Sequence, residues 1–267
     1  MLGLVKANFA ADLAYYRRSR LLLAFLLVFL LLVGLYSLPP LFSDSSVQDF
    51  NALREIYEVL NGFIFFFAGG LGLFVISSHL RNRSLKMVFT KPCSPAVWLG
   101  SAFLAAFAAT LLMECIVLAS VATLSIGWHL PVRAALVFEA LDTLVGAMGI
   151  AAYLILLATV MHPAIAATFA LIFNAELFYS ADTWAQAVIR SGDTGMFLRG
   201  LERLFHVLYL LLPMAHVFGT QTEGVYTSMR VLHGEWKYIV YSFGYSMTLS
   251  AFCYFLALFA LQRKQHI

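Results

Sequence analysis

The sequence predicts an all-α integral membrane protein with six transmembrane helices, and its composition supplies the first two reasons. Hydrophobic residues make up 62% of the 267-residue chain, whereas only 12% of its residues are charged. The mean hydropathy is +0.86. Soluble globular domains carry about 25% charged residues. The chain therefore has too few charges to cover a water-exposed surface, and a soluble fold is excluded.

The third reason is that the apolar residues gather in six runs separated by polar segments. A helix needs about 20 apolar residues to cross the hydrocarbon core of a bilayer. Pro39 and Pro40 end the first run, and Ser94 with Pro95 favours a helix start before the third. We expect a single transmembrane domain over residues 1–267, with spans at residues 21–38, 59–78, 97–125, 134–160, 164–179 and 239–261.

Residues 1–20 precede the first span and are predicted to form an interfacial helix. Apolar residues recur there at helical spacing and the cations lie off that stripe, although a solvated N-terminus is the alternative. Three arginines followed by an apolar run also resemble a signal peptide. The run continues to residue 38 without a small-residue cleavage site, which favours a retained span. The apolar stripe contains Leu2, Val5, Phe9, Leu13 and Tyr16.

The longest segment between predicted spans, residues 180–238, is expected on the outer side of the membrane. It contains an apolar stretch at residues 204–218 that is short for a span and is interrupted by Pro213. We expect this stretch to form a re-entrant helical hairpin. Lysine and arginine are concentrated in the segments on the opposite side, so the positive-inside rule places both termini in the cytosol.

Two polar residues inside the predicted spans are candidates for a translocation path. Glu114 lies near the centre of the third span, where a charged side chain is costly and usually faces a protein interior or a wet cavity. It either lines the path or hydrogen-bonds a neighbouring helix, and the sequence leaves both interpretations open. Asn174 shares one face of the fifth span with Ala166 and Ala170, and small-residue faces of this kind allow helices to pack closely.

Several motifs of enzymes and nucleotide-binding proteins are missing from the sequence. It contains no Gly-x-x-x-x-Gly-Lys-Ser/Thr loop, no His-Glu-x-x-His zinc motif and no Gly-x-Ser-x-Gly nucleophile motif. We therefore expect no catalytic, cofactor-binding or metal site in this chain, and not an enzyme. The net charge of +3 reflects cations beside the spans, so no nucleic-acid partner is expected.

A basic segment, residues 79–95, connects the second and third predicted spans. Within it, residues 80–91 are predicted to form a short amphipathic helix with Leu85, Val88 and Phe89 on one face. Pro92 ends this helix. A cationic amphipathic helix on the cytosolic side either lies on the lipid or docks on a soluble partner. The cations of the segment are Arg81, Arg83, Lys86 and Lys91.

Six spans, cytosolic termini, the basic loop and the outer hairpin together resemble the permease subunits of ABC-2-type ATP-binding-cassette exporters. The sharpest local similarity is the run Ser-Leu-Lys-Met-Val-Phe-Thr-Lys-Pro-Cys-Ser-Pro at residues 84–95, followed by Gly100 and by Phe-Leu-Ala at residues 103–105. It is similar to the loop in which that family's coupling helix leads through a Pro-x-Ser turn into a span. The sequence departs from the family at residues 81–84, Arg-Asn-Arg-Ser, where acidic residues and a glycine are common.

This resemblance implies how the protein works. A separate ATPase subunit, which binds ATP and Mg²⁺, would drive the chain through the coupling helix at residues 80–91. Two permease chains, identical or homologous, would form the path in the cell inner membrane and export a lipid-linked, amphiphilic or polymeric substrate. The residues implied to contact the ATPase are Arg81, Arg83, Leu85, Lys86, Val88 and Phe89.

Two other functions are compatible with the same residues. A secondary transporter or channel that needs no ATPase would use Glu114 as its ion or proton site. A membrane anchor or assembly subunit would have no translocation path and would move nothing, even beside a working ATPase.

Overall fold

The computed structural model describes residues 2–42, 50–81, 94–129, 135–190, 195–213 and 235–265. These residues form nine helices and contain no β-strand, which confirms the predicted all-α class for this part of the chain. In chain order the helices are α1 (Leu2–Arg18), α2 (Leu21–Phe42), α3 (Phe50–Arg81), α5 (Pro95–Gly127), α6 (Ala135–Val160), α7 (Pro163–Ile172), α8 (Ala175–Arg190), α9 (Met196–Leu211) and α11 (Glu235–Gln265).

Five helical segments of the described chain are long and apolar enough to cross a membrane. Val5–Arg18 and Leu21–Leu35 also meet this criterion as a pair bent by 57°, which gives six spans if the pair counts as one. By length and composition the protein is therefore a multi-pass membrane protein. The five segments are Ile56–Ser77, Pro95–Gly127, Ala140–Val160, Pro163–Arg190 and Val240–Arg263.

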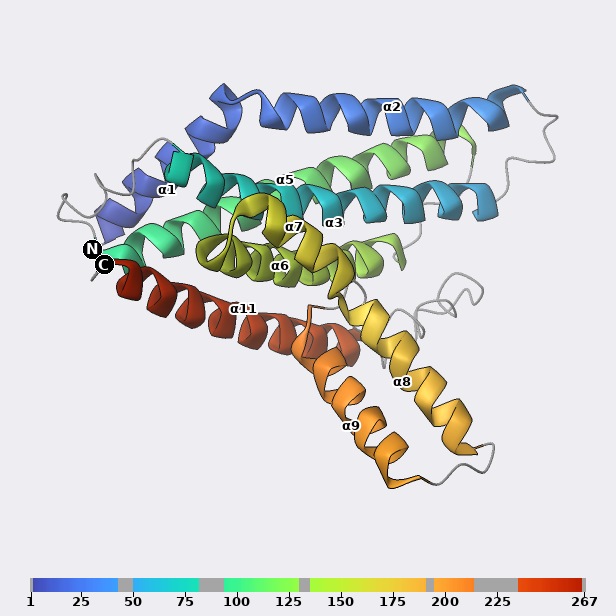
Figure 1. Ribbon diagram of the computed structural model, residues 1–267. Coiled ribbons are helices and arrows are strands. Elements are labelled where there is room, and N and C mark those ends of the chain that lie inside the picture. Colours follow the sequence, from blue (N-terminus) through green and yellow to red (C-terminus); the bar gives the residue numbers. More distant parts are fainter. Residues whose placement is uncertain are drawn as a thin grey trace.

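The centre of the bundle is formed by α3, α5 and α6, with α2 and α11 on opposite flanks (Figure 1). Glycines permit close approach of α3 to α6. A Cβ atom at Gly72 would lie 2.8 Å from the backbone oxygen of Ala151, and one at Gly69 would lie 2.7 Å from Leu154 Cδ1. The two helices are therefore closer than side chains at these positions would allow.

Helix α1 lies at the end of the bundle where both termini are found (Figure 1). Tyr16 is fully buried, and its ring centroid lies 6.2 Å from that of Phe74 in α3. Asp12 is also buried, and its Oδ2 accepts a hydrogen bond of 3.4 Å from Ser101 Oγ in α5. Apolar and polar contacts thus fix α1 to the bundle, while its predicted place at a membrane surface stays a prediction.

The helix in the region of the fifth predicted span is longer than expected and is broken. α7 ends at Ile172, and after a break at Phe173 and Asn174, α8 continues to Arg190, past the predicted end at residue 179. Residues 181–187 include three alanines, which are strong helix formers, so nothing local ends the helix at residue 179.

The outer hairpin also differs from the one predicted at residues 204–218. α8 and α9 pack against each other as an antiparallel pair that projects from the bundle, so the chain reverses before residue 196 (Figure 1). α9 is one continuous helix that ends just before Pro213, which cannot extend it. Residues 214–218 lie outside the described residues.

The predicted coupling helix lies almost wholly outside the described residues. Arg81 is the last residue of α3, and residues 82–93 are not described. The roles predicted for Arg83, Leu85, Lys86, Val88 and Phe89 therefore stay predictions.

The start of α5, which follows this segment, is as predicted. Ser94 Oγ accepts a hydrogen bond of 3.3 Å from the backbone N–H of Val97, and Pro95 is the first helical residue. The serine satisfies a backbone donor of the first turn, and the proline needs no acceptor there.

Candidate functional site

The candidate site is centred on the break between α7 and α8. Asn174 holds both helix ends: its Nδ2 donates a hydrogen bond of 3.0 Å to the carbonyl oxygen of Leu171, and its Oδ1 accepts one of 2.8 Å from the backbone N–H of Leu177. The side chain thus satisfies a carbonyl at the end of α7 and an amide at the start of α8, groups that a helix end leaves without partners. The break is therefore a defined turn.

The break lies near the middle of the length of the bundle (Figure 1). α7 contains ten residues and rises about 15 Å, half of the hydrocarbon core of about 30 Å. It follows α6 after only Met161 and His162, so it starts at the membrane depth where α6 ends. Non-helical backbone at mid-bilayer depth is tolerated only where it is covered by protein or lines a cavity.

A cavity of about 500 Å³ adjoins the break. Its walls come from α3, α6, α7 and the α7–α8 turn, and Pro213 also lines it. The α3 wall runs from Gly62 to Leu73, a distance of about 16 Å along the helix axis. Phe66 and Leu171 lie at its rim and are 69% and 66% exposed, so the cavity opens at the side of the bundle.

The cavity walls are almost entirely apolar. Among the described residues, no charged side chain lines the cavity, and the only polar side chains that line it are those of Tyr153 and Asn174. Gly62 borders open space, because a Cβ atom there would meet no atom within 4 Å. Ligand sites commonly have this character, with apolar walls and a few convergent polar groups that orient the ligand. The arrangement suits an uncharged, largely apolar group.

Glu114, the other predicted path residue, does not line this cavity. It lies on the buried face of α5 and is 4% exposed. Neither of its carboxylate oxygens has a hydrogen-bond partner among the described residues. The structure therefore does not bring Glu114 and Asn174 together in one site, and only Asn174 borders the cavity.

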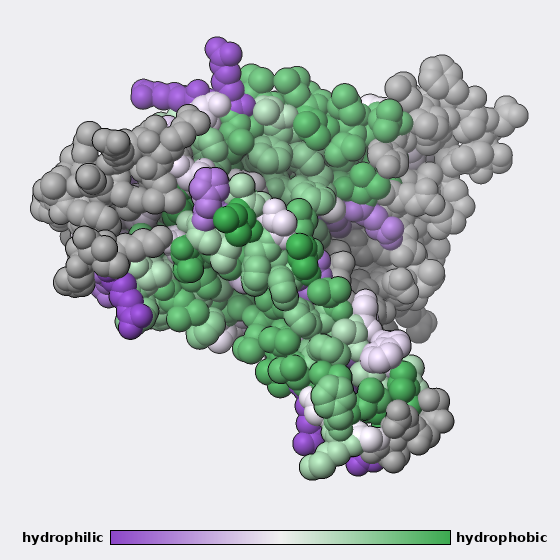
Figure 2. All heavy atoms as spheres, viewed as in Figure 1, coloured by the Kyte–Doolittle hydropathy of each residue, from purple (hydrophilic) through white to green (hydrophobic). Residues whose placement is uncertain are grey.

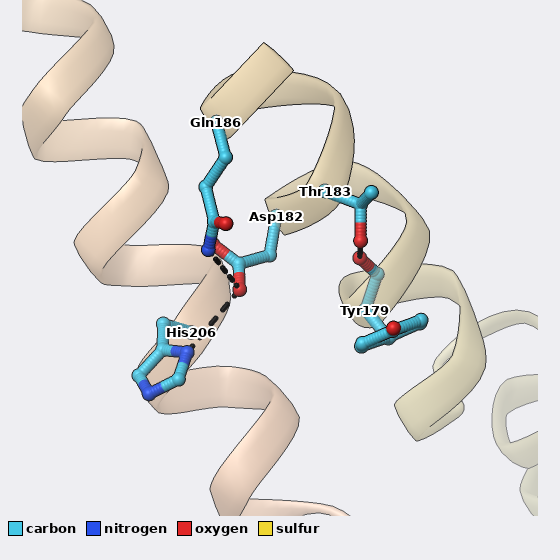
Figure 3. A network of polar contacts seen from close by, with 5 residues as sticks. All are labelled: Tyr179, Asp182, Thr183, Gln186 and His206. Carbon is cyan, nitrogen blue, oxygen red and sulfur yellow. Dashed lines mark hydrogen bonds and ion pairs between the residues drawn. The ribbon is translucent and has the colours of Figure 1, made fainter. Parts of the chain in front are cut away.

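A second polar cluster lies between α8 and α9 and has Asp182 at its centre (Figure 3). Asp182 Oδ2 accepts a hydrogen bond of 3.2 Å from Gln186 Nε2 and lies 3.2 Å from His206 Nδ1. The side chain of Asp182 is 6% exposed, whereas that of His206 is 54% exposed. This cluster and the neighbouring ring pair of Tyr179 and Tyr209, with centroids 5.4 Å apart, join the two helices.

The surroundings of Tyr209 favour its neutral phenol. Burial raises the pKa of Tyr209, and the neighbouring Tyr179 and Asp182 raise it further. Sequence reasoning missed this cluster. The spacing of Asp182 and Gln186 puts them on one helix face, but nothing in the sequence identifies His206 as their partner on another helix.

The base of the α8–α9 hairpin is attached beside the cavity. Tyr245 Oη of α11 lies 2.5 Å from the carbonyl oxygen of Leu212 and 3.1 Å from that of Leu210. Pro213 is buried, and its Cβ would lie 3.6 Å from a Cβ atom at Gly149 of α6. A movement of the hairpin would therefore displace Pro213 and change the shape of the cavity that it lines.

The described residues contain no group of three or more His, Cys, Asp or Glu side chains placed to hold a metal ion. No protein-family model, no curated protein and no solved structure matches this chain. The functional argument therefore depends on the sequence and on the geometry of the cavity and the broken helix.

Proposed function

We propose that this chain is the membrane-spanning permease subunit of an ABC-2-type exporter and that a separate ATPase drives it. The observation that carries the proposal is the break at Asn174, midway along the bundle (Figure 1) and beside an apolar cavity of about 500 Å³. Broken membrane-crossing helices are typical of proteins that bind and move substrates within membranes. The sequence motif at residues 84–95 and the missing phosphate-binding loop favour an ATPase on another chain.

The course of α3 supports a mechanical link between the ATPase and the cavity. α3 is one uninterrupted helix from Phe50 to Arg81 and forms one wall of the cavity with residues 62–73. The proposed coupling helix follows directly at its end. Because a helix transmits displacement along its axis, a push on that segment would shift the cavity wall against α7. The capped turn at Asn174 allows α7 and α8 to change their angle during this movement.

The exposure of the broken segment supports a second permease chain as partner. Only 12% of the most apolar window of Pro163–Arg190 is buried within the chain, against 61% for Ile56–Ser77 and 67% for Ala140–Val160. The broken segment is therefore the wall of the cavity least covered by its own chain. A second permease chain packed there would close the cavity into a path through the membrane.

The coupling role is tested with the ATPase that we expect to co-purify with this protein. We expect Leu85→Glu and Phe89→Glu to abolish stimulated ATP hydrolysis while the protein still inserts. Met87→Glu is the matched control, because a helix over residues 80–91 places Met87 on the face opposite Leu85. Normal stimulation in the two test variants, or failure to recover any ATPase with the chain, would contradict the proposal.

A second candidate function is a secondary transporter, and the burial of Glu114 favours it. A carboxyl that is 4% exposed and without a partner among the described residues is the kind of group that binds protons or ions in transporters. Transport by the isolated chain in liposomes, lost in Glu114→Gln, would establish this function in place of the first.

A further inference from the structure

The turn between α1 and α2 holds its backbone in a fixed, unfavourable conformation. Arg20 has a φ of 60°, in the left-handed region that side chains disfavour. Ser19 stabilises the turn, since its Oγ lies 2.9 Å from the carbonyl oxygen of Tyr16 and 3.4 Å from the backbone nitrogen of Leu21. Such backbone strain persists only where the surrounding structure enforces it.

Contacts with α3 hold this turn against the bundle. The rings of Tyr15 and Tyr16 lie 5.5 Å and 6.2 Å from the ring of Phe74, measured between centroids. Tyr16 is fully buried. Groups that project from the turn are therefore presented from a rigid base, which lowers the entropy cost of binding a ligand.

The groups that project are cationic. Arg17, Arg18 and Arg20 are all exposed, and hydrophilic side chains extend from the junction of α1 and α2 in Figure 2. No carboxylate of the described residues forms an ion pair with them. Asp12, the acidic residue of α1, is buried, and its Oδ2 accepts a hydrogen bond from Ser101 Oγ. Three exposed arginines within four residues concentrate positive charge at this turn, and guanidinium groups bind phosphate through paired hydrogen bonds.

An apolar face begins directly beside these arginines. The first turns of α2 carry leucines that are 56% (Leu23) and 59% (Leu27) exposed, and Leu31 continues this face at 65%. A free phosphate ion would use only the arginines. A phospholipid would place its phosphate on the arginines and its acyl chains along the leucines, so it fits both parts of the surface.

We propose that the turn between α1 and α2 binds an anionic phospholipid. The headgroup phosphate lies among Arg17, Arg18 and Arg20, and the acyl chains lie along the exposed leucine face of α2. The bound lipid stabilises the turn and fixes the position of α2 against α3. This inference does not depend on the exporter function, because it uses none of the cavity residues.

The experiment compares the purified full-length protein in nanodiscs of phosphatidylcholine with nanodiscs of an equimolar mixture of phosphatidylcholine and phosphatidylglycerol. We expect the mixture to raise the unfolding temperature of the wild type and lipid mass spectrometry to find phosphatidylglycerol enriched around it. The triple variant Arg17→Gln, Arg18→Gln, Arg20→Gln should lose both effects. Each single substitution should weaken phosphatidylglycerol binding about fivefold and serves if the triple variant does not fold.

A matched control removes three exposed cations elsewhere, as Arg190→Gln, Arg199→Gln, Arg203→Gln, and should keep both effects. Equal phosphatidylglycerol enrichment in the wild type and the first triple variant would overturn the proposal. It would also be overturned if inorganic phosphate in phosphatidylcholine nanodiscs reproduced the full rise in unfolding temperature, because the arginines would then form a simple anion site.

Discussion

The α3–α5–α6 core and the α7–α8–α9 arm are built in different ways. In the core, half or more of each apolar window is buried, from 50% in α5 to 67% in α6, whereas the figure for the segment covering α7 and α8 is 12%. The core is held by close glycine contacts and apolar packing. The arm is held by the polar groups around Asn174 and Asp182, by aromatic pairs, and by a small apolar cluster in which Ala166 of α7 packs against α6.

This difference separates a rigid part of the molecule from one able to move. Packed interiors resist deformation because every displacement creates voids or clashes. An arm attached at a few points changes its angle when those points change, and the cavity lies between the two parts. We therefore expect movement to occur at α7, α8 and α9, and substitutions in the core and the arm to have different consequences.

The largest effect is expected in the core, from Gly72→Leu. A Cβ atom there would lie 2.8 Å from the backbone oxygen of Ala151, which cannot rotate away. We expect a loss of stability of about 3 kcal/mol or more, as for severe overpacking, measured by thermal unfolding in detergent. Gly62→Ala is the control on the same helix, because its Cβ atom would meet nothing within 4 Å. Equal stability of the two variants would mean that α3 and α6 are not closely packed.

A smaller and more local effect is expected from Asn174→Ala. The variant loses the hydrogen bonds to Leu171 and Leu177, and loss of a helix cap costs about 1–2 kcal/mol. Hydrogen exchange should increase at the end of α7 and the start of α8 and stay unchanged in α3. Asn174→Asp keeps the acceptor for the Leu177 N–H and should recover protection in α8 alone. Increased exchange throughout the bundle would contradict the separation of arm and core.

The attachment of the hairpin is tested by Tyr245→Phe. This change removes the hydroxyl group that contacts the carbonyl oxygens of Leu210 and Leu212 and leaves the ring in place. We expect a cost of about 1 kcal/mol and faster hydrogen exchange at the C-terminal end of α9. Tyr241→Phe is the matched control, because Tyr241 is 66% exposed on the same helix. If both variants behave like the wild type, the hydroxyl does not hold the hairpin.

The smallest effect is expected at the pair formed by Asp182 and His206, whose Oδ2 and Nδ1 atoms lie 3.2 Å apart. The pair joins α8 to α9, and His206→Gln removes the ring that contacts the carboxylate. Because His206 is half exposed, we expect a loss of less than about 1 kcal/mol.

Hydrogen exchange of α8 and α9 measures the effect. His206→Gln should slightly increase exchange in these two helices, while His162→Gln, at an exposed histidine outside the hairpin, should leave it unchanged. Equal exchange in the two variants would mean that the pair does not hold α8 and α9 together.

The fold class and several limits of helices could be predicted from the sequence because they depend on local properties. Long apolar runs identify membrane-crossing helices whatever their neighbours are. Ser94 and Pro95 predict the start of α5 correctly, since capping involves only the first turn of that helix. Asn174 was identified as a candidate from its position among small residues, and it borders the cavity.

The break, the hairpin and the cavity could not be predicted because they depend on contacts between distant segments. Asparagine occurs within helices as well as at their ends, so Asn174 alone does not predict the break. Asp182 and His206 are 24 residues apart, and no periodicity pairs them. The cavity is bounded by three helices and Pro213, and it exists only through their packing.

The central claim is that an ATPase moves the arm against the core across the cavity. The most direct measurement is the rate at which a short bifunctional reagent crosslinks Phe66→Cys to Leu171→Cys, on a background with Cys93, Cys115 and Cys253 replaced by serine. In the complex with the proposed ATPase partner, ATP should change this rate, and Leu85→Glu with Phe89→Glu should abolish the change. A crosslinking rate that is the same with and without ATP in the active complex would contradict the account.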